Sequence, residues 1–346
     1  MNFDLTDEQR LLQNTVRDFA RNEVVPVAEE LDRTKAFPYE IVAKLGDLGL
    51  MGIPFPEEYG GSGGDILSYA LAVEELARID SSVAITMAAH ISLGTTPIYN
   101  WGTDEQKADW MPELTAGRKL AAFGLTEPEA GSDAGNTKTR AELDGDEWVV
   151  NGAKQFITNS GTDISACVTI TAVTGKDENG RPEISNIIVP NGTPGYTVDP
   201  PYRKMGWNAS DTHPLTFEDA RVPESNLLGP RGQGFRQFLQ ILDGGRIGVA
   251  AMSVGVAQGA LDEAIKYAKE RQAFGQSISK FQSIQAKIAD ISAQLEAARL
   301  LTYRAAIEKD RGENFSLTAA QAKLITGRLA VRATEEAVQI HGGYGF

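Results

Sequence analysis

The sequence predicts an α+β protein of several domains, in which helical regions lie before and after a region of antiparallel β-strands. Helical spacing of apolar residues in the first third, strand patterns with turn dipeptides after about Gly117, and long helical patterns from Phe235 predict this order. We place the domains at residues 1–117, 118–230 and 231–346. A chain of 346 residues is long enough for two or three compact units with buried cores.

The N-terminal region is predicted to be mainly helical. Thr6 followed by Gln9 resembles a capping box at the start of a helix. The apolar residues that continue this helix are Leu11, Leu12, Val16, Phe19 and Ala20. Helical patterns also cover residues 40–50, 66–79 and 83–99, and a loop rich in proline and glycine lies at 54–64.

The middle region combines β-rich runs with turn dipeptides. The dipeptides are Asp144-Gly145, Asn151-Gly152 and Asn179-Gly180, and the predicted strands cover residues 148–150, 166–173, 184–189 and 217–222. Hairpin turns at this density indicate antiparallel pairing. The glycine-rich segment 229–234 marks the end of the region.

The C-terminal region is predicted to be a helical bundle. One seam of residues at alternating spacings of three and four requires a partner helix. Its members are Phe281, Ile284, Ile288, Ile291, Leu295, Ala298 and Thr302. Residues 246–269 are rich in glycine and alanine, which permits close helix approach, and core packing is the preferred interpretation of both patterns.

Composition excludes several classes of protein. A net charge of −14 and a pI near 4.8 argue against nucleic acid or an anionic membrane as the main partner. Cys167 is the only cysteine, so an internal disulfide framework is excluded, and the three histidines give little support for a metal site. We expect a cytoplasmic protein, because no signal peptide and no apolar run of about 20 residues is present.

Residues 123–133, Phe-Gly-Leu-Thr-Glu-Pro-Glu-Ala-Gly-Ser-Asp, suit neither a regular helix nor a regular strand. Gly124 and Gly131 permit close backbone approach to a ligand, and Pro128 removes one backbone donor. Thr126 and Ser132 supply hydroxyl groups that donate and accept hydrogen bonds. From these residues alone, a ligand-binding loop and an ordinary surface turn remain open.

Four separated motifs together resemble one family. They are the 123–133 loop, Lys-Gln-Phe-Ile-Thr-Asn at 154–159, Arg-Gln-Ala-Phe-Gly at 271–275, and Gln-Ile-His-Gly-Gly-Tyr-Gly at 339–345. In this order and spacing the chain resembles the acyl-CoA dehydrogenases, most closely the short-chain, butyryl-type members. The resemblance implies a helical N-terminal domain, a middle β-barrel-like domain and a C-terminal bundle that lacks its last helix. It also implies one FAD per subunit in a homotetramer built as a dimer of dimers.

The resemblance also assigns site residues. The expected flavin contacts within one subunit are Phe123, Leu125, Thr126, Ser132, Phe156, Ile157 and Thr158. The residues expected to reach the FAD of a neighbouring subunit are Arg271, Phe274, Gln282, Gln339, Ile340, Gly342 and Gly343. Ser132, Asp243 and Arg246 are expected to contact the substrate. Many relatives carry tryptophan where this chain has Phe156, so ring stacking is kept while the indole donor is lost.

The implied reaction is α,β-dehydrogenation of a short- to medium-chain acyl-CoA to the trans-2-enoyl-CoA in fatty acid β-oxidation, with electrons passed to an electron-transfer flavoprotein. A carboxylate must remove the α-proton, and desolvation would raise its pKa toward the working range. The base of the long-chain and isovaleryl members is absent, because Gly245 stands in its position.

We assign no catalytic residue. The short-chain base is expected beyond Phe346, which favours a truncated chain over a natural short form. Glu127 and Glu129 are expected to be structural or exposed to solvent. An acyl-CoA oxidase, and a non-catalytic subunit that binds FAD or acyl-CoA, remain as alternatives.

Overall fold

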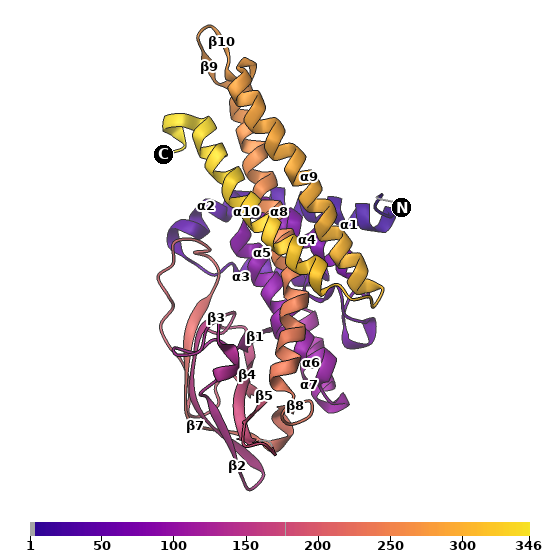
Figure 1. Cartoon of the computed structure of the whole chain (residues 1–346), viewed down its shortest axis with the longest axis vertical. Coiled ribbons are helices and arrows are strands. Elements are labelled where there is room, and N and C mark those ends of the chain that lie inside the picture. Colours follow the sequence, from indigo (N-terminus) through magenta and orange to yellow (C-terminus); the bar gives the residue numbers. More distant parts are fainter. Residues whose placement is uncertain (1–3, 177) are drawn as a thin grey trace. The chain divides into compact units, whose positions relative to one another are not determined.

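A computed structural model describes residues 4–176 and 178–346 (Figure 1). The helices are α1 (Asp7–Phe19), α2 (Val25–Thr34), α3 (Tyr39–Asp47), α4 (Ile66–Ala77), α5 (Ser81–Ala89), α6 (Thr96–Trp101), α7 (Asp104–Thr115), α8 (Gly234–Glu270), α9 (Gln282–Asp310) and α10 (Ser316–His341). The strands are β1 (Leu120–Gly124), β2 (Arg140–Asp144), β3 (Glu147–Thr158), β4 (Ser165–Lys176), β5 (Pro182–Pro190), β6 (Tyr196–Val198), β7 (Thr212–Pro223), β8 (Leu227–Leu228), β9 (Gln272–Ala273) and β10 (Gln276–Ser277). The predicted order of helices, then strands, then helices is confirmed.

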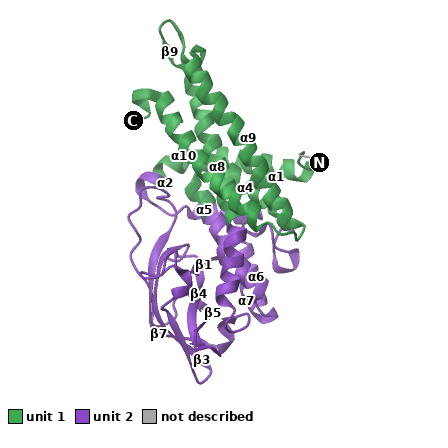
Figure 2. Cartoon of the chain, viewed as in Figure 1, with its two compact units in different colours: residues 1–30, 65–85, 246–346 green, residues 31–64, 86–245 purple. Residues whose placement is uncertain are grey.

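The chain forms two compact units, each built from separate segments (Figure 2). Unit 1 contains residues 1–30, 65–85 and 246–346, and unit 2 contains residues 31–64 and 86–245. Each unit therefore takes residues from more than one of the three regions read from the sequence, and the domain boundaries at 117 and 230 stay a prediction. Within the described residues, no helix is both long enough and apolar enough to cross a membrane.

The capping box predicted at the first helix is present. The Thr6 hydroxyl accepts a hydrogen bond from the Gln9 backbone, and the Gln9 side chain accepts one from the Thr6 backbone. Two N–H groups that lack partners within the helix are thereby satisfied, which fixes where α1 begins.

The sheet of unit 2 follows the order β6-β7-β3-β2-β4-β5-β8, and β1 pairs with β4. Most pairs are antiparallel, as predicted, but β4 runs parallel to both β1 and β2. A parallel pair requires a crossover connection rather than a hairpin turn, so the turn dipeptides gave no signal for it. Among the described strands, β6 and β8 at the two ends do not pair with each other, so the sheet is not a closed barrel.

The prediction of a turn at Asn151-Gly152 is wrong. Strand β3 continues through both residues, and its register against β7 shifts between Val150 and Gly152. Gly152 has a φ of +149°, and a Cβ there would lie 2.7 Å from the Cα of Thr139. The dipeptide therefore forms a β-bulge, which uses the same glycine freedom as a turn without reversing the chain. The Asp144-Gly145 turn between β2 and β3 is confirmed.

The helices of unit 1 pack closely, as the glycines of α8 predicted. A Cβ at Gly255 would lie 2.8 Å from the Cβ of Ala77, and one at Gly259 would lie 3.1 Å from the carbonyl carbon of Arg78. The predicted seam is confirmed in its second half, because Ile291, Leu295, Ala298 and Thr302 of α9 are buried. Its first three members, Phe281, Ile284 and Ile288, are half-buried. Small residues on α8 therefore let this helix approach backbone atoms of neighbouring elements.

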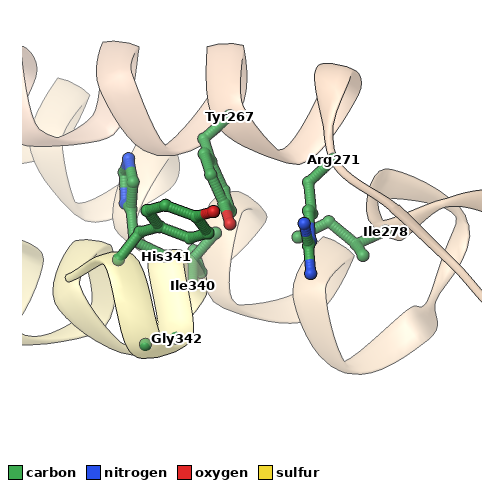
Figure 3. A pocket seen from close by; sticks show the side chains of 8 residues that line it. Tyr267, Arg271, Ile278, Ile340, His341 and Gly342 are labelled. Carbon is green, nitrogen blue, oxygen red and sulfur yellow. The ribbon is translucent and has the colours of Figure 1, made fainter. Parts of the chain in front are cut away.

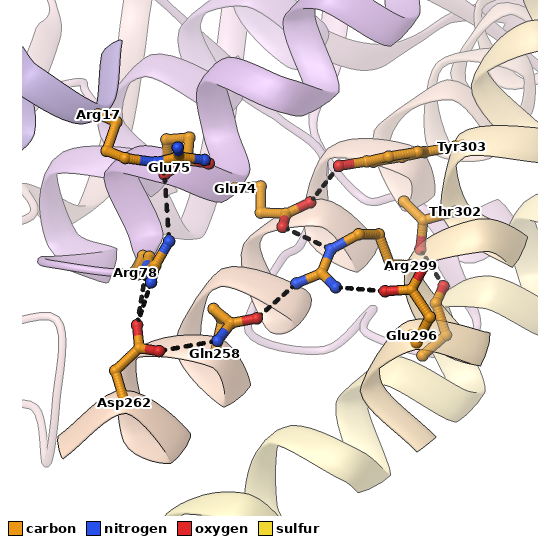
Figure 4. Close-up of polar contacts among 11 residues, drawn as sticks. Arg17, Glu74, Glu75, Arg78, Gln258, Asp262, Glu296, Arg299, Thr302 and Tyr303 are labelled. Carbon is orange, nitrogen blue, oxygen red and sulfur yellow. Dashed lines mark hydrogen bonds and ion pairs between the residues drawn. The ribbon is translucent and has the colours of Figure 1, made fainter. Parts of the chain in front are cut away.

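A buried charged network joins α4, α8 and α9 within unit 1 (Figure 4). Glu74 on α4 is 3 % exposed and accepts hydrogen bonds from Arg299 Nε at 2.8 Å and from the Tyr303 hydroxyl at 2.9 Å. Arg299 also donates to Gln258 Oε1 at 2.7 Å. Burial raises the pKa of Glu74, although Arg299 opposes that shift. The carboxylate can stay ionised in this core only because both of its oxygens are satisfied.

Candidate functional site

The first two residues of the 123–133 segment belong to strand β1, and the residues after them form a loop. Phe123 and Gly124 are the last residues of β1, and the Phe123 ring stacks on Phe238 with centroids 5.7 Å apart. Beyond the strand, Glu127 and Ala130 form an isolated antiparallel bridge that closes a tight loop. Ser132 lies on the exposed part of this loop. The sequence located the irregular segment correctly, but its first two residues belong to the sheet.

The two glutamates of the loop have different surroundings. Glu127 is buried and forms an ion pair with Lys154 at 2.7 Å. Glu129 is exposed. Both carboxylates were expected to be structural or exposed to solvent, and these positions agree with that expectation: Glu127 is structural and Glu129 faces solvent.

Strand β3 brings the second motif against this loop. The Gln155 backbone N–H donates to the Thr126 carbonyl at 2.7 Å, so loop and strand are held together by a main-chain hydrogen bond. The pairing of β3 with β7 shifts register between Lys154 and Ile157, and Phe156 within this bulge has a φ of +62°. A phenylalanine in this region of φ is strained, and such strain is concentrated at functional sites.

The bulge decides which side chains of this motif can reach a ligand. Phe156 is 62 % exposed, and its ring lies 4.8 Å from that of Tyr202. Ile157 is 3 % exposed and belongs to the hydrophobic core of the sheet, so its side chain is committed to packing. Thr158 is partly exposed. Of the three predicted contacts on β3, Phe156 therefore offers an open aromatic face, and Ile157 has only backbone atoms to offer.

Unit 1 contains a pocket of about 390 Å³ built from the last two motifs (Figure 3). Its lining residues are Tyr267, Arg271, Ile278, Ile340, His341, Gly342, Gly343 and Tyr344. The Arg271 guanidinium lies 6.0 Å from the centre of the Tyr344 ring. The pocket therefore combines one cation, aromatic rings and the glycine backbone that follows α10.

His341 makes structural contacts in this pocket. Its ring stacks on Tyr267 with centroids 4.4 Å apart, and Nδ1 lies 2.7 Å from the Ala337 carbonyl oxygen. These contacts hold the end of α10 against α8. Tyr267 was missed by sequence reasoning, although it lies four residues before Arg271, and the Arg271 backbone N–H donates to the Tyr267 carbonyl at 2.8 Å just past the end of α8.

A short hairpin of β9 and β10 carries Phe274 at its tip. Phe274 has a φ of +52° and is 95 % exposed, and Gly275 beside it has a φ of +77°. Two successive residues at positive φ define the tight hairpin turn that glycine and asparagine normally occupy. The Phe274 ring lies perpendicular to the Phe281 ring, with centroids 6.0 Å apart. This exposed, strained aromatic residue has the properties of a contact residue rather than a core residue.

The structure brings the predicted site residues together in two groups, one in each unit. The first group includes Phe123, Leu125, Thr126, Ser132 and the β3 motif, all in unit 2. The second is the pocket and hairpin of unit 1, with Gln282 and Gln339 exposed beside them in sequence. Asp243 and Arg246 both belong to α8, but Asp243 is part of unit 2 and Arg246 part of unit 1. Their shared contact with substrate stays a prediction.

These residues fit a flavin dinucleotide. Within the described chain, a Cβ added at Gly131, Gly342 or Gly343 would meet no atom within 4 Å, so these backbones lie open to a ligand. The exposed Phe156 ring suits a flat heteroaromatic group. The Arg271 fork suits a pyrophosphate. Fold and site together define a flavin-binding oxidoreductase.

Comparisons with known proteins identify the family. Three descriptions match in order along the chain: the N-terminal domain of acyl-CoA dehydrogenases over residues 6–118, the middle domain over 122–220 and the C-terminal domain over 232–346. The chain therefore belongs to the acyl-CoA dehydrogenase family. Members of this family are oxidoreductases that use FAD.

Individual relatives are similar over the whole chain. A probable acyl-CoA dehydrogenase of Bacillus subtilis, YngJ, is 52 % identical over all of this chain and 90 % of its own length. The structure of butyryl-CoA dehydrogenase from Megasphaera elsdenii is 45 % identical with a TM-score of 0.96, covering all of this chain and 91 % of that one. A structure on the electron transferring flavoprotein of Acidaminococcus fermentans contains a chain that is 46 % identical with a TM-score of 0.96, over all of this chain and 90 % of that one.

Proposed function

We propose that this chain catalyses the FAD-dependent α,β-dehydrogenation of a short- to medium-chain acyl-CoA to the trans-2-enoyl-CoA, and that an electron-transfer flavoprotein receives the electrons. One observation carries the proposal. The 123–133 loop and the bulge of β3 are joined by the hydrogen bond between Gln155 and Thr126, and the exposed Phe156 ring lies at this junction. The similarity to the butyryl-CoA dehydrogenase of Megasphaera elsdenii supports a short acyl chain.

The residues divide into groups with separate tasks. Bound FAD would supply the acceptor for the hydride that leaves the β-carbon of the acyl group. Leu125, Thr126, Phe156 and Thr158 would hold the flavin ring, Ser132 would lie near its pyrophosphate, and Asp243 with Arg246 would contact the substrate. Gly245 stands immediately before Arg246, so no carboxylate side chain lies between Asp243 and Arg246 in the sequence. No described residue is assigned as the base that removes the α-proton.

The proposal predicts that substrate bleaches the flavin. Purified protein loaded with FAD is mixed without oxygen with butyryl-, octanoyl- or palmitoyl-CoA, and the visible flavin absorption is followed. We expect bleaching, fastest with butyryl- or octanoyl-CoA, in a chain extended past Phe346 by the segment expected to carry the base, and reoxidation by electron-transfer flavoprotein. Equally fast bleaching of the unextended chain would contradict the placement of the base beyond Phe346. Bound flavin that shifts its spectrum without bleaching in both chains identifies a binding subunit. Rapid peroxide formation in air identifies an oxidase.

A second copy of the chain is the expected partner of α10. Four apolar residues of this helix recur every seven positions and are more than half exposed: Leu317 (70 %), Leu324 (53 %), Val331 (59 %) and Val338 (51 %). A stripe with this spacing is typical of a helix that packs against another helix. It supports the homotetramer, in which Arg271 and the Gly342–Gly343 backbone would reach the FAD of a neighbouring subunit. Light scattering coupled to size exclusion measures the number of chains.

A further inference from the structure

Lys154 is a fully buried cation beside the 123–133 loop. Its side chain is 0 % exposed, and its ammonium group donates to Glu127 Oε1 at 2.7 Å, to the Thr171 carbonyl at 2.7 Å and to the Thr171 hydroxyl at 3.1 Å. The Leu125 carbonyl oxygen lies 3.3 Å away and is also within reach of this group. A buried ammonium group is tolerated only where its protons are satisfied in this way. Lys154 thus joins β3, β4 and the loop at one point.

Glu127 connects the 123–133 loop to residues 137–139, which follow it in the chain. Oε1 also accepts from the Thr137 hydroxyl at 2.8 Å and from the Thr139 backbone at 3.1 Å, and Oε2 accepts from the Lys138 backbone at 2.5 Å. Burial opposes the ionisation of Glu127, but Lys154 and these donors outweigh it and hold the pKa at about 2. The carboxylate is therefore an anion that gathers residues 137–139 around the beginning of the loop.

The surroundings are shaped for the Lys154 side chain. A Cβ on Gly124 would lie 3.2 Å from Lys154 Cγ, so the glycine at the end of β1 leaves room for the lysine stem. Lys154 is also the last residue before the register shift of β3 that turns Phe156 outward. Phe156 and Thr158 follow Lys154 by two and four residues. The loop that Lys154 anchors contains Leu125 and Thr126. One buried ion pair therefore connects both halves of the expected flavin site in unit 2.

We propose that Lys154 and Glu127 are positioning residues for the flavin: their ion pair sets the separation and orientation of the 125–126 backbone relative to the Phe156–Thr158 segment. The inference rests on the proposed function, because that proposal assigns the 125–126 backbone and the Phe156–Thr158 segment to FAD binding. Neither side chain touches the cofactor in this role. Glu127 is thereby distinguished from a catalytic carboxylate, since its acceptor positions are already occupied by Lys154 and by residues 137–139.

The experiment compares Lys154→Met, Glu127→Gln and the double variant with the unaltered chain. Lys154→Met leaves a buried carboxylate without its cation, so we expect this single variant to lose stability for that reason alone. The double variant removes both charges, so no unpaired buried ion remains. Glu113→Gln is the matched control, because Glu113 pairs with Arg118 in the same unit while both side chains are at least half exposed.

Three readouts are needed: the thermal midpoint of the apoprotein, the dissociation constant for FAD, and the circular dichroism of the bound flavin. We expect the double variant to regain a midpoint near that of the unaltered chain. It should nonetheless bind FAD at least about tenfold more weakly, because the 125–126 backbone and the Phe156–Thr158 segment would no longer be held in a fixed orientation before FAD binds. We also expect an altered flavin spectrum. The Glu113→Gln control should leave all three readouts unchanged.

Two outcomes would overturn the inference. If the double variant regains both stability and FAD affinity with an unaltered flavin spectrum, the pair is structural only, and the proposed function stands. If the unaltered chain binds no FAD, the proposed function fails, and with it the assignment of the two faces. Amide exchange of residues 125–139 in the apoprotein then still reports on the anchor, and equal exchange in the double variant and the unaltered chain rejects it.

Discussion

Gly255 on α8 offers a direct test of close helix packing in unit 1. A Cβ at this position would lie 2.8 Å from the Cβ of Ala77, 3.0 Å from the backbone nitrogen of Arg78, and closer still to the carbonyl oxygen of Glu74. Two of these three atoms are backbone atoms of residues in or at the end of α4, so no side-chain rotation can relieve the contact. Even the Ala77 contact requires a movement of about 0.6 Å, from 2.8 Å to the ordinary 3.4 Å.

The expected effect of Gly255→Ala follows from two opposing contributions. Alanine has a higher helix propensity than glycine by about 1 kcal/mol. Overpacking of a closely packed core costs about 1–3 kcal/mol, and contact with backbone places this site at the upper end. We therefore expect the free energy of unfolding to fall by about 1–2 kcal/mol, although the higher helix propensity of alanine acts in the opposite direction.

Urea unfolding followed by far-UV circular dichroism measures the change, as the shift in midpoint multiplied by the slope. Gly327→Ala on α10 is the matched control, because within the described chain a Cβ there meets no atom within 4 Å. This variant should gain about 0.5–1 kcal/mol from propensity alone. Equal stabilisation by both substitutions would refute the packing argument.

Three further predictions concern charge and assembly. Arg299→Met should lower the free energy of unfolding by about 3–5 kcal/mol, because it leaves Glu74 buried without its cation. Arg118→Met, at a pair whose two side chains are at least half exposed, should change it by less than about 1 kcal/mol in the same urea assay. The pKa of Glu127 is lowered to about 2, so its ionisation contributes on the order of 3 kcal/mol to the free energy of unfolding. This contribution is fully present above the ordinary pKa of 4.5 and is lost as the pH falls toward 2. In acid titrations, Glu127→Gln should therefore lose stability less steeply over that range than the unaltered chain. Val331→Glu should reduce the number of associated chains measured by light scattering, and an unchanged mass would exclude the α10 stripe as an interface.

The sequence located most elements because their signals are local. The capping box at Thr6, the seam of α9 and the small residues of α8 each depend on neighbours within a few positions of the chain. Asn151-Gly152 was misread for the same reason: the dipeptide reports that the backbone can take a positive φ, but the partner strand decides between a turn and a bulge. The parallel neighbours of β4 also depend on residues far away in sequence.

For the site, the sequence by itself determined which four motifs are present and which residue types they contain, and it thereby indicated the family and FAD. Tertiary structure decided what each side chain can do. Phe156 and Ile157 are adjacent in one motif, yet the bulge of β3 exposes the first ring and buries the second side chain. In the sequence, Glu127 resembled any other loop carboxylate, and only the fold shows that Lys154 lies beside it. The physical reason is that pairing, burial and pKa depend on distances between residues remote in sequence, which a linear pattern does not contain.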